Sequence, residues 1–226
     1  MPLLYFWENQ KMQTLKDINF KDQRAIVRVD FNVPLDKDLQ ITDITRIKAA
    51  KPTIDYILSK GGSCVLLSHL GRPYGFEQRL SFQNIIDKVS EVLETKVQFC
   101  KTSVGPEAQS RADSLMPGEV LLMENLRFNA EETEGDVVFS ERLSKLGTIF
   151  VNDAFGTAHR AHASTTIIAS FFQNNKCFGS LLEKEVLAID KVMKDGIPPI
   201  LAILGGAKVS TKITIIESLL EKVNHL

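Results

Sequence analysis

Short apolar runs alternate with longer amphipathic segments along most of the chain. The apolar runs are rich in β-branched and aliphatic side chains, and they predict six strands: Ala25–Asp30, Ser63–Ser68, Val97–Cys100, Glu119–Met123, Thr148–Asn152 and Pro199–Leu204. Several of these runs are apolar throughout, which is typical of strands that are covered on both faces in a parallel sheet.

The segments between the runs have the spacing of amphipathic helices. In Ser81–Glu94 the apolar side chains fall on one stripe, and Ser81 is the expected N-cap. The same spacing predicts three more helices: Asp136–Lys145, Glu183–Lys194 and Lys208–Val223. A helix is also predicted over Thr42–Lys60. We expect Pro52 to break or kink it near Lys51, because proline has no amide hydrogen and clashes with the preceding turn.

Alternation of strand and helix predicts the fold class. We expect a doubly wound α/β/α sandwich of three layers around a parallel sheet, followed by the first βα unit of a second α/β domain. The length of 226 residues fits either one large domain or one full domain with a piece of another. A chain of this size can bury enough surface to need no disulfide or metal for stability.

Composition narrows the class of protein. The 27 basic and 28 acidic residues leave a formal charge of −1, so the chain as a whole does not attract nucleic acid or anionic membranes. Cys64, Cys100 and Cys177 are widely spaced, which predicts buried thiols in a reducing compartment. No apolar run reaches the roughly 18 residues that span a bilayer, and the N-terminus does not resemble a signal peptide. We expect a cytoplasmic protein without nucleic-acid or membrane partners.

Basic residues follow several predicted strands, at ends that meet on one rim of a parallel sheet. Arg72, Arg127 and Arg160 each lie in such a segment. A guanidinium group donates two parallel hydrogen bonds to phosphate or carboxylate, so these arginines predict an anion site. With Arg46 from the first helical segment, they would neutralise a small phosphorylated acid. Solvated surface arginines are the alternative.

Other polar residues near the same rim extend the hypothesis. Asp30 and Asn32 would supply an acceptor and a donor for a hydroxyl or carboxylate group. His69 would donate to phosphate; the alternative is a strand-end histidine bonded to the backbone. His159 and His162 have a spacing that could serve a metal, but no H-E-x-x-H cluster accompanies them, and we expect no metal site.

A glycine turn precedes the last predicted helix, in the sequence Gly205-Gly206-Ala207-Lys208. Backbone amides at a helix N-terminus, with Lys208 and Lys212 one turn apart, would hold a phosphate; a simple turn is the alternative. The sequence contains no G-x-S-x-G elbow and no cysteine close to a histidine. Catalysis through a protein nucleophile is therefore not predicted.

Seven segments together resemble the phosphoglycerate kinase family and occur in the family's order. They are RVDFNVP (Arg28–Pro34), TDITRI (Thr42–Ile47), SHLGRP (Ser68–Pro73), LLMENLRF (Leu121–Phe128), NDAFGTAHRAHAST (Asn152–Thr165), LLEKEV (Leu181–Val186) and ILGGAKVSTKI (Ile203–Ile213). Three features depart from the family's pattern. Tyr74 stands where lysine is usual, Thr211 stands where aspartate is usual between the two lysines, and Thr166-Ile167-Ile168 replaces a continuation that usually contains glycine.

The resemblance implies an enzyme of glycolysis, a phosphotransferase with a carboxyl acceptor. It would transfer a phosphoryl group reversibly between 1,3-bisphosphoglycerate and ADP, giving 3-phosphoglycerate and ATP, with Mg²⁺. It also implies a domain division: an N-terminal extension at 1–11, a phosphoglycerate-binding domain at 12–182, an interdomain helix at 183–196 and the start of a nucleotide-binding domain at 197–226. Full-length members are expected to be monomers.

The same resemblance assigns roles to residues. Substrate binding falls to Asp30, Phe31, Asn32, Arg46, His69, Leu70, Gly71, Arg72, Arg127 and Arg160. Nucleotide binding falls to Gly205, Gly206, Ala207, Lys208 and Lys212, and catalysis to Arg46, Lys208 and Lys212. The magnesium ligand is expected beyond this sequence. We therefore expect the 226-residue chain to be inactive alone while still binding phosphoglycerate; the alternative is a short phosphoglycerate-binding module without kinase activity.

Overall fold

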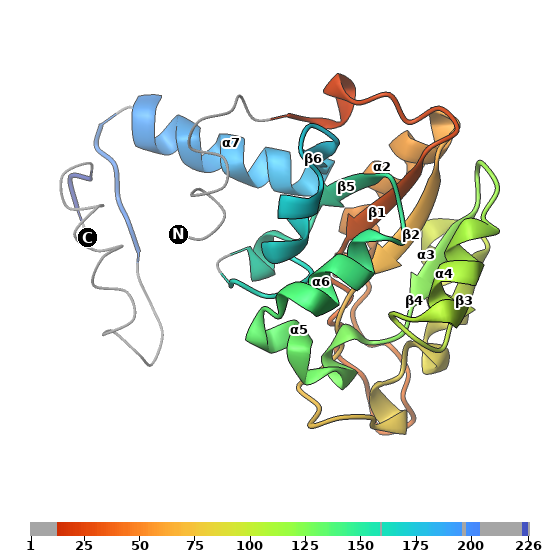
Figure 1. Ribbon diagram of the computed structural model, residues 1–226. Helices are drawn as coiled ribbons and strands as arrows, with labels where there is room; N and C mark the ends of the chain where they lie inside the picture. Colours follow the sequence, from red (N-terminus) through yellow and green to blue (C-terminus); the bar gives the residue numbers. More distant parts are fainter. Residues whose placement is uncertain (1–12, 159, 196–197, 204–222, 226) are drawn as a thin grey trace. The chain divides into compact units, whose positions relative to one another are not determined.

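A computed structural model of the chain describes residues 13–158, 160–195, 198–203 and 223–225. Its centre is one six-stranded sheet in the order β3-β4-β2-β1-β5-β6 (Figure 1). The strands are β1 (Arg24–Arg28), β2 (Ser63–Leu67), β3 (Val97–Cys100), β4 (Val120–Met123), β5 (Ile149–Asn152) and β6 (Lys176–Phe178). Every neighbouring pair is parallel, which confirms the predicted parallel α/β fold.

Helices connect the strands. The α-helices are α2 (Thr45–Ser59), α3 (Ile86–Leu93), α4 (Pro106–Asp113), α5 (Ala130–Glu134), α6 (Val137–Ser144) and α7 (Ser180–Asp195). Short 3₁₀ turns are η1 (Leu15–Asp17), η2 (Gln78–Leu80), η3 (Phe82–Asn84), η4 (Leu126–Phe128), η5 (Phe155–Thr157) and η6 (Ile167–Phe171).

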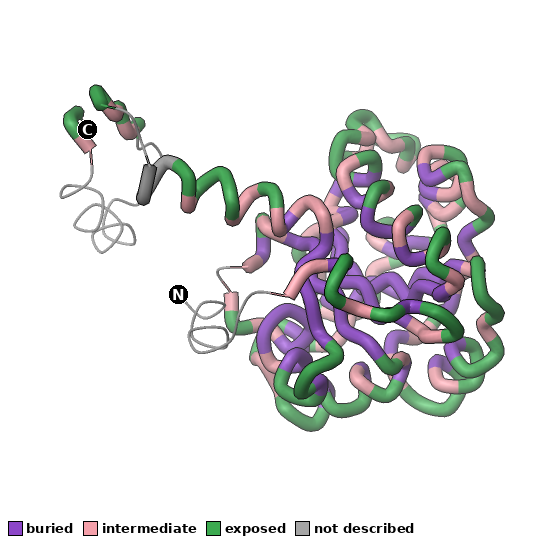
Figure 2. The backbone as a smooth tube through the Cα atoms, turned by 90° about the horizontal axis from the view of Figure 1, so that it is seen from above, coloured by how far each residue is buried: buried purple, intermediate pink, exposed green. Residues whose placement is uncertain are grey.

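The sheet is buried on both faces, because successive residues of a strand point to opposite sides. In β1, Ala25 and Val27 join a core with side chains of α2 and α3, whereas Ile26 joins a second core with α4 and α6. In Figure 1 α6 lies in front of the sheet and α2 behind it. Figure 2 shows the buried strands between exposed helical turns. These two cores give the three layers that the sequence predicted.

Helix α2 corrects the prediction of a break at Pro52, since one continuous helix includes this residue. Proline removes the hydrogen bond that the amide of residue 52 would donate to the carbonyl of Lys48. Both residues lie on the exposed side of the helix, where water can satisfy that carbonyl. The opposite side buries Ile47, Ile54 and Ile57 in the core, and this burial holds the helix together.

The strand predictions differ from the structure at the C-terminal side. Within the described residues 198–203 there is no strand, and Leu201 makes only an isolated bridge to His225. A single bridge does not supply the ladder of hydrogen bonds that a strand needs. Conversely, β6 was not predicted, because it has only three residues and begins with a lysine, Lys176. Most of the predicted helix Lys208–Val223, and with it most of the predicted first βα unit of a second domain, lies outside the described residues.

The N-terminal ends of two helical segments agree with the sequence predictions more closely than the C-terminal strand does. Ser81 accepts a hydrogen bond from the Gln83 amide, as the expected N-cap, although it caps η3 and α3 begins only at Ile86. Asp136 likewise accepts from the Phe139 amide at the start of α6. An aspartate or serine oxygen satisfies a helical amide that has no partner within the helix.

The chain forms two compact units, Met1–Glu183 and Lys184–Leu226. The sheet belongs to the first unit. Cys64, Cys100 and Cys177 are buried as free thiols, and burial raises the pKa of Cys64 and Cys177. Among the helices of the described residues, none has the length and apolar character required to cross a bilayer.

Candidate functional site

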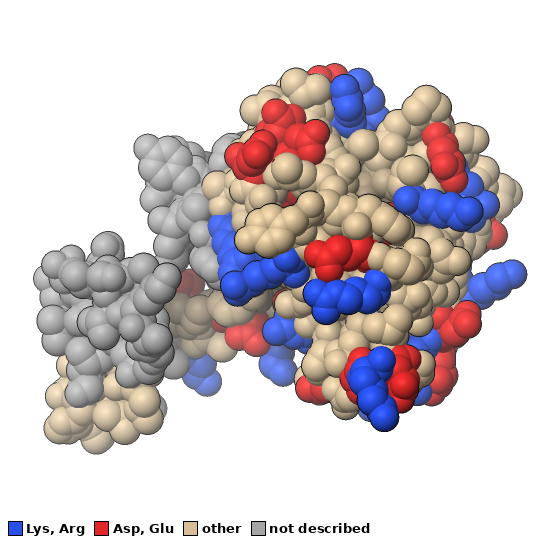
Figure 3. All heavy atoms as spheres, turned by 90° about the horizontal axis from the view of Figure 1, so that it is seen from below, with Lys and Arg blue, Asp and Glu red and all other residues tan. Residues whose placement is uncertain are grey.

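The carboxyl ends of the strands gather the loops that the sequence singled out. Strand β1 lies between β2 and β5, so the chain passes from one side of β1 to the other between β4 and β5. Ligands of open α/β sheets bind at such a crossing. Seen from below in Figure 3, basic and acidic side chains are interspersed over the surface. A preference for anions must therefore come from a local cluster.

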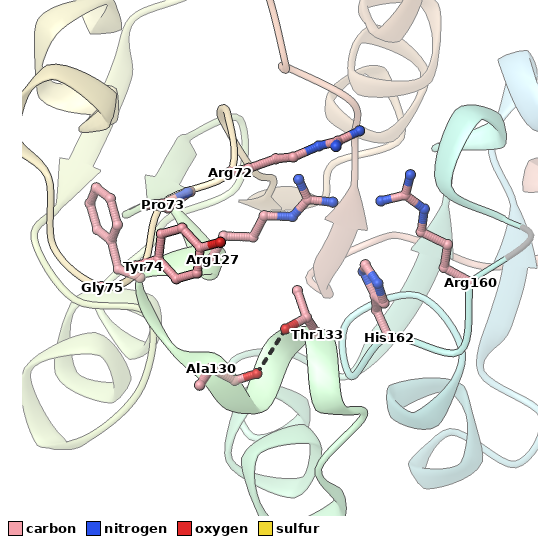
Figure 4. A pocket seen from close by; sticks show the side chains of 10 residues that line it. Arg72, Pro73, Tyr74, Gly75, Arg127, Ala130, Thr133, Arg160 and His162 are labelled. Carbon is pink, nitrogen blue, oxygen red and sulfur yellow. Dashed lines mark hydrogen bonds between the residues drawn. The ribbon is translucent and has the colours of Figure 1, made fainter. Parts of the chain in front are cut away.

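A cavity of about 590 Å³ lies among these loops, and its lining is basic on one side and aromatic on the other. It is lined by Arg72, Pro73, Tyr74, Gly75, Arg127, Phe128, Ala130, Thr133, Arg160 and His162. Figure 4 shows the three guanidinium groups turned toward the same part of the cavity. None of the lining residues that the structure describes is acidic. Three cations without a carboxylate favour an anionic ligand.

Arg127 is held by its own turn and by the loop that follows β2. It is 8% exposed, and its Nη1 donates to the Gly71 carbonyl at 2.7 Å. Its amide donates to the Asn125 side chain at 3.1 Å, while the Asn125 amide group donates to the Leu70 carbonyl at 2.7 Å. Burial lowers the pKa of Arg127, and the nearby Arg160 lowers it further, but a guanidinium stays charged in proteins.

Gly71 occupies a place that only glycine fits easily. Its φ is +67°, and a Cβ there would come within 2.9 Å of Leu80. Its amide donates to Asn32 Oδ1 at 2.8 Å, and its carbonyl accepts from Arg127. One peptide segment thus joins the loop that follows β1 to the loop that follows β4.

Arg160 is positioned by the turn that follows it. Its carbonyl accepts hydrogen bonds from the hydroxyls of Thr165, at 3.0 Å, and Thr166, at 3.2 Å. The same turn is anchored by Glu132 of α5, which is fully buried and accepts from the Ser164 amide at 3.0 Å and the Ser164 hydroxyl at 2.6 Å. The backbone that carries Arg160 is therefore tied to the protein interior.

Arg28 at the end of β1 is fully buried behind the cavity. Its Nε donates to the Ser164 hydroxyl at 2.8 Å, and the same hydroxyl donates to Glu132. Burial lowers the pKa of Arg28 and raises the pKa of Glu132, while the attraction between the two charges opposes both shifts. Arg28 and Glu132 are thus two opposite buried charges that are connected through a serine hydroxyl.

His69 lies beside this pair and is 3% exposed. Its Nδ1 is 3.2 Å from Nη2 of Arg28. Burial, followed by the charges of Arg28, Arg127 and other cations, lowers the pKa of His69 to about 2. The imidazole is therefore neutral at ordinary pH. It does not belong to the lining of the cavity.

The remaining predicted substrate residues lie outside the cavity lining. Arg46 forms an ion pair with Asp30, and their side chains are 49% and 14% exposed. The backbone amide of Asn32 donates to Oδ1 of Asp30 at 3.2 Å. The side chains of Phe31 and Leu70 are buried in the core.

The predicted nucleotide residues cannot be placed. Gly205, Gly206, Ala207, Lys208 and Lys212 lie outside the described residues, and so does His159. Within the described residues, no group of three or more histidine, cysteine, aspartate or glutamate side chains could hold a metal ion.

Several residues of the site were missed by sequence reasoning. They are the aromatic side of the cavity, Tyr74 and Phe128, and the buried residues Arg28, Glu132 and Ser164. A charged residue at the end of an otherwise apolar strand was the available sign for Arg28. Glu132 had no such sign, because it lies in an acidic segment that reads as a solvated helix turn.

Comparisons with known proteins agree on one family. The family model described as phosphoglycerate kinase matches residues 15–226. The phosphoglycerate kinase of Porphyromonas gingivalis is 46% identical, over 94% of this chain and 57% of the relative. The cytosolic phosphoglycerate kinase of Nicotiana tabacum is 45% identical, over 94% of this chain and 53% of the relative.

Solved structures give the same result. The phosphoglycerate kinase structure from Coxiella burnetii matches with a TM-score of 0.82 at 36% identity, covering 95% of this chain and 53% of that one. The structure from Pyrococcus horikoshii matches with a TM-score of 0.83 at 34% identity, covering 94% of this chain and 54% of that one. The chain thus spans about half the length of the relatives that it matches.

Proposed function

This chain belongs to the phosphoglycerate kinase family, and on that premise we propose that its arginine-lined cavity receives the phosphate group of phosphoglycerate. The observation that carries the proposal is the meeting of Arg72, Arg127 and Arg160 from three separate loops, with no acidic residue among the described lining. A phosphate dianion would neutralise most of that charge through charge-assisted hydrogen bonds.

The other end of the substrate would lie toward β1. We propose that Asp30 and Asn32 meet its hydroxyl and carboxylate groups, with His69 as an additional donor. Arg46 would leave its pair with Asp30 to face the transferred phosphoryl group. Backbone groups of Phe31, Leu70 and Gly71 would complete the wall of the site.

The proposed reaction of the whole protein is phosphoryl transfer between 1,3-bisphosphoglycerate and ADP. The reverse nucleophile is a carboxylate, which is ionised at neutral pH because its reference pKa is roughly 3.5. No general base is required, and positioning with charge neutralisation would supply the rate enhancement. A neutral, buried His69 is consistent with such a mechanism.

Nucleotide and metal belong to the same proposal. ADP or ATP would be held by Gly205, Gly206, Ala207, Lys208 and Lys212. Magnesium prefers carboxylate and phosphate oxygens, and the arginine-lined cavity does not fit it. The proposed domains are residues 12–182 for phosphoglycerate and residues from 197 onward for nucleotide, joined by the helix at 183–196. A cytoplasmic, monomeric protein is proposed, in line with relatives named as cytosolic.

Calorimetric titration of 3-phosphoglycerate into the purified chain tests the proposed site. Arg160→Met removes one charged donor, which corresponds to a loss of about 1.5–3 kcal/mol, or roughly tenfold to more than a hundredfold in affinity. Arg142→Met is the matched control, because Arg142 is exposed on α6 and does not line the cavity. Equal affinity of Arg160→Met and wild type, with both folded by circular dichroism, would contradict the proposal.

A further inference from the structure

The buried residues behind the cavity set the state of one histidine. Arg28 Nη2 and His69 Nδ1 are 3.2 Å apart, which is hydrogen-bonding distance. A guanidinium group has donors only, so Nδ1 must be the acceptor. The single proton of the neutral imidazole then lies on Nε2. The tautomer is therefore determined by the partner.

The orientation of Arg28 is fixed in turn. Its Nε donates to Ser164 at 2.8 Å and its Nη1 donates to the Val29 carbonyl. Since the Ser164 hydroxyl accepts from Arg28, its own proton goes to Glu132, at 2.6 Å. All of these groups are buried. Each hydrogen bond between Glu132, Ser164, Arg28 and His69 therefore has a fixed donor and a fixed acceptor.

The second nitrogen of His69, Nε2, retains a small accessible area. In the described part of the chain the hydrogen bond of His69 is made through Nδ1. A fully buried Nε2 without a hydrogen bond would count as an unsatisfied polar atom, and Nε2 is not one of these atoms. The small exposed fraction of His69 therefore includes Nε2, at the rim formed by the carboxyl ends of β1 and β2.

We propose that Arg28 is a positioning residue, which holds His69 as a neutral imidazole with its proton on Nε2, so that a fixed donor faces the phosphoglycerate. This inference rests on the proposed function. As a result, His69 would contribute equally to phosphoglycerate binding over the whole pH range in which an ordinary histidine gains a proton. The charged and titratable groups around His69 are Arg28 of β1, Arg127 of η4, and Arg160 and His162 of the loop after β5. All four disfavour a second proton on the ring.

Nitrogen-15 NMR of the histidine side chains, recorded on the full chain without ligand between pH 5 and 8, tests the tautomer. His69→Gln assigns the signal. In wild type we expect an unprotonated Nδ1, a protonated Nε2 and no titration. Arg28→Gln introduces a partner that both donates and accepts, so the tautomer with its proton on Nδ1 should become populated and the His69 nitrogen shifts should change. A wild-type midpoint near 6.5, a proton on Nδ1, or an unchanged His69 in Arg28→Gln would overturn the proposal.

Loss of Arg28 alone leaves Glu132 without its cation, and that variant is prone to misfolding. The double variant Arg28→Gln/Glu132→Gln removes both charges and carries the same expectation for His69. Ser90→Ala serves as a control for mutational effects in general, because Ser90 bonds within the α3 region, to the Ile86 carbonyl and the Val97 amide. Its His69 signal should match that of wild type.

A binding measurement tests the donor. Glutamine places an amide near the position of Nε2, whereas asparagine reaches only to that of Nδ1. His69→Gln should therefore keep its affinity for 3-phosphoglycerate within about threefold, and His69→Asn should lose roughly tenfold or more, as one hydrogen bond to a charged group implies. His225→Asn, in the second unit, is the matched control. Equal losses in both His69 variants would overturn the donor role.

The two experiments separate the inference from its premise. A wild-type chain with the expected NMR signals that binds no 3-phosphoglycerate would overturn the proposed function and leave the effect of Arg28 on His69 standing. A chain that binds 3-phosphoglycerate with an ordinarily titrating His69 would overturn the inference alone.

Discussion

The two ends of the proposed substrate site are held in different ways. At the phosphate end, Arg127 is 8% exposed and is bonded to neighbouring backbone, and Arg28 behind it is fully buried. At the other end, Arg46 is 49% exposed and forms an ion pair with Asp30. The phosphate end is therefore preorganised for a ligand. At the other end Arg46 and Asp30 bind each other, so they must separate before they can bind a ligand.

This difference has an energetic basis. An exposed ion pair is worth roughly 0–1 kcal/mol, so Arg46 can leave Asp30 at little cost. Leaving a buried charge without its counter-charge costs about 3–5 kcal/mol, so Glu132 and Arg28, which are connected through Ser164, stay in place. We expect the rigid end to determine affinity for phosphate, and the adaptable end to follow the changing charge of the substrate.

The strongest way to break the rigid end is Glu132→Ala. It leaves Arg28 buried without its counter-charge and frees the turn at Ser164, and we expect a loss of about 3–5 kcal/mol in the free energy of unfolding. Urea denaturation measures it. Glu131→Ala is the matched control, since Glu131 is its exposed neighbour on α5. Similar losses in the two variants would show that the pair does not anchor this end.

Gly71→Ala should disturb the junction of the two ends. The left-handed backbone disfavours alanine by about 1 kcal/mol, and contact with Leu80 raises the total to roughly 2 kcal/mol. Affinity for 3-phosphoglycerate should also fall, because Gly71 bonds to Asn32 and Arg127. Gly118→Ala isolates the backbone effect, since its φ is +86° and its Cβ would meet open space. Unfolding and calorimetry on both variants would show whether the contact matters.

Asp153 sharpens the comparison, because it is buried like Glu132 but is bonded to amides of Leu181 and Leu182 rather than to an arginine. Burial raises the pKa of Asp153 to about 6. The folded protein then binds its proton more readily than the unfolded chain, so this group lowers stability above about pH 6 and ceases to do so as the pH falls toward 4. Asp153→Asn should gain about 1 kcal/mol at pH 7.5.

The gain in Asp153→Asn should shrink at pH 5, where wild-type Asp153 is largely protonated. Thermal unfolding at the two pH values measures it. Asp113→Asn provides a matched control, because Asp113 is half exposed in its ion pair with Arg24. A gain that grows toward low pH would mean that the carboxylate, and not the acid, is the favoured form.

The smallest effect is expected at the adaptable end. Arg46→Ala removes an exposed ion pair and should change the free energy of unfolding by less than about 1 kcal/mol. Lys48→Ala is the control, because Lys48 is also exposed and lies two residues further along α2. Melting temperatures of both variants should lie close to that of wild type. A loss as large as that of Glu132→Ala would remove the distinction between the two ends.

The sequence predicted the sheet and the arginines of the cavity well, because both follow from local patterns. Five strands were expected within one or two residues, since apolar runs such as 63–67 are set by burial on both faces. Arg72, Arg127 and Arg160 were placed together by a general rule about where parallel strands end. That rule does not predict which side chains contact these arginines.

What could not be predicted depends on contacts between distant residues. Arg28 and Ser164 are 136 positions apart, and no periodicity connects them. Helix α2 runs through Pro52 because core packing outweighs a local preference. Strand β6 contains Lys176, whose burial depends on the carbonyl of Ala169 that receives its ammonium group. Local propensity carries no information about such partners.

The position of β1 between β2 and β5 has a consequence for synthesis on the ribosome. Strand β1 is made first, but its partner β5 begins 125 residues after β1 starts, at Ile149 against Arg24. Pairings over such distances form slowly, because a long loop must close before any contact is made. Arg28 therefore lacks its Ser164 partner, and β1 lacks one neighbouring strand, until the segment with Ser164 has left the exit tunnel. During that interval the emerging chain exposes an open sheet edge, which is the state that chaperones protect from aggregation.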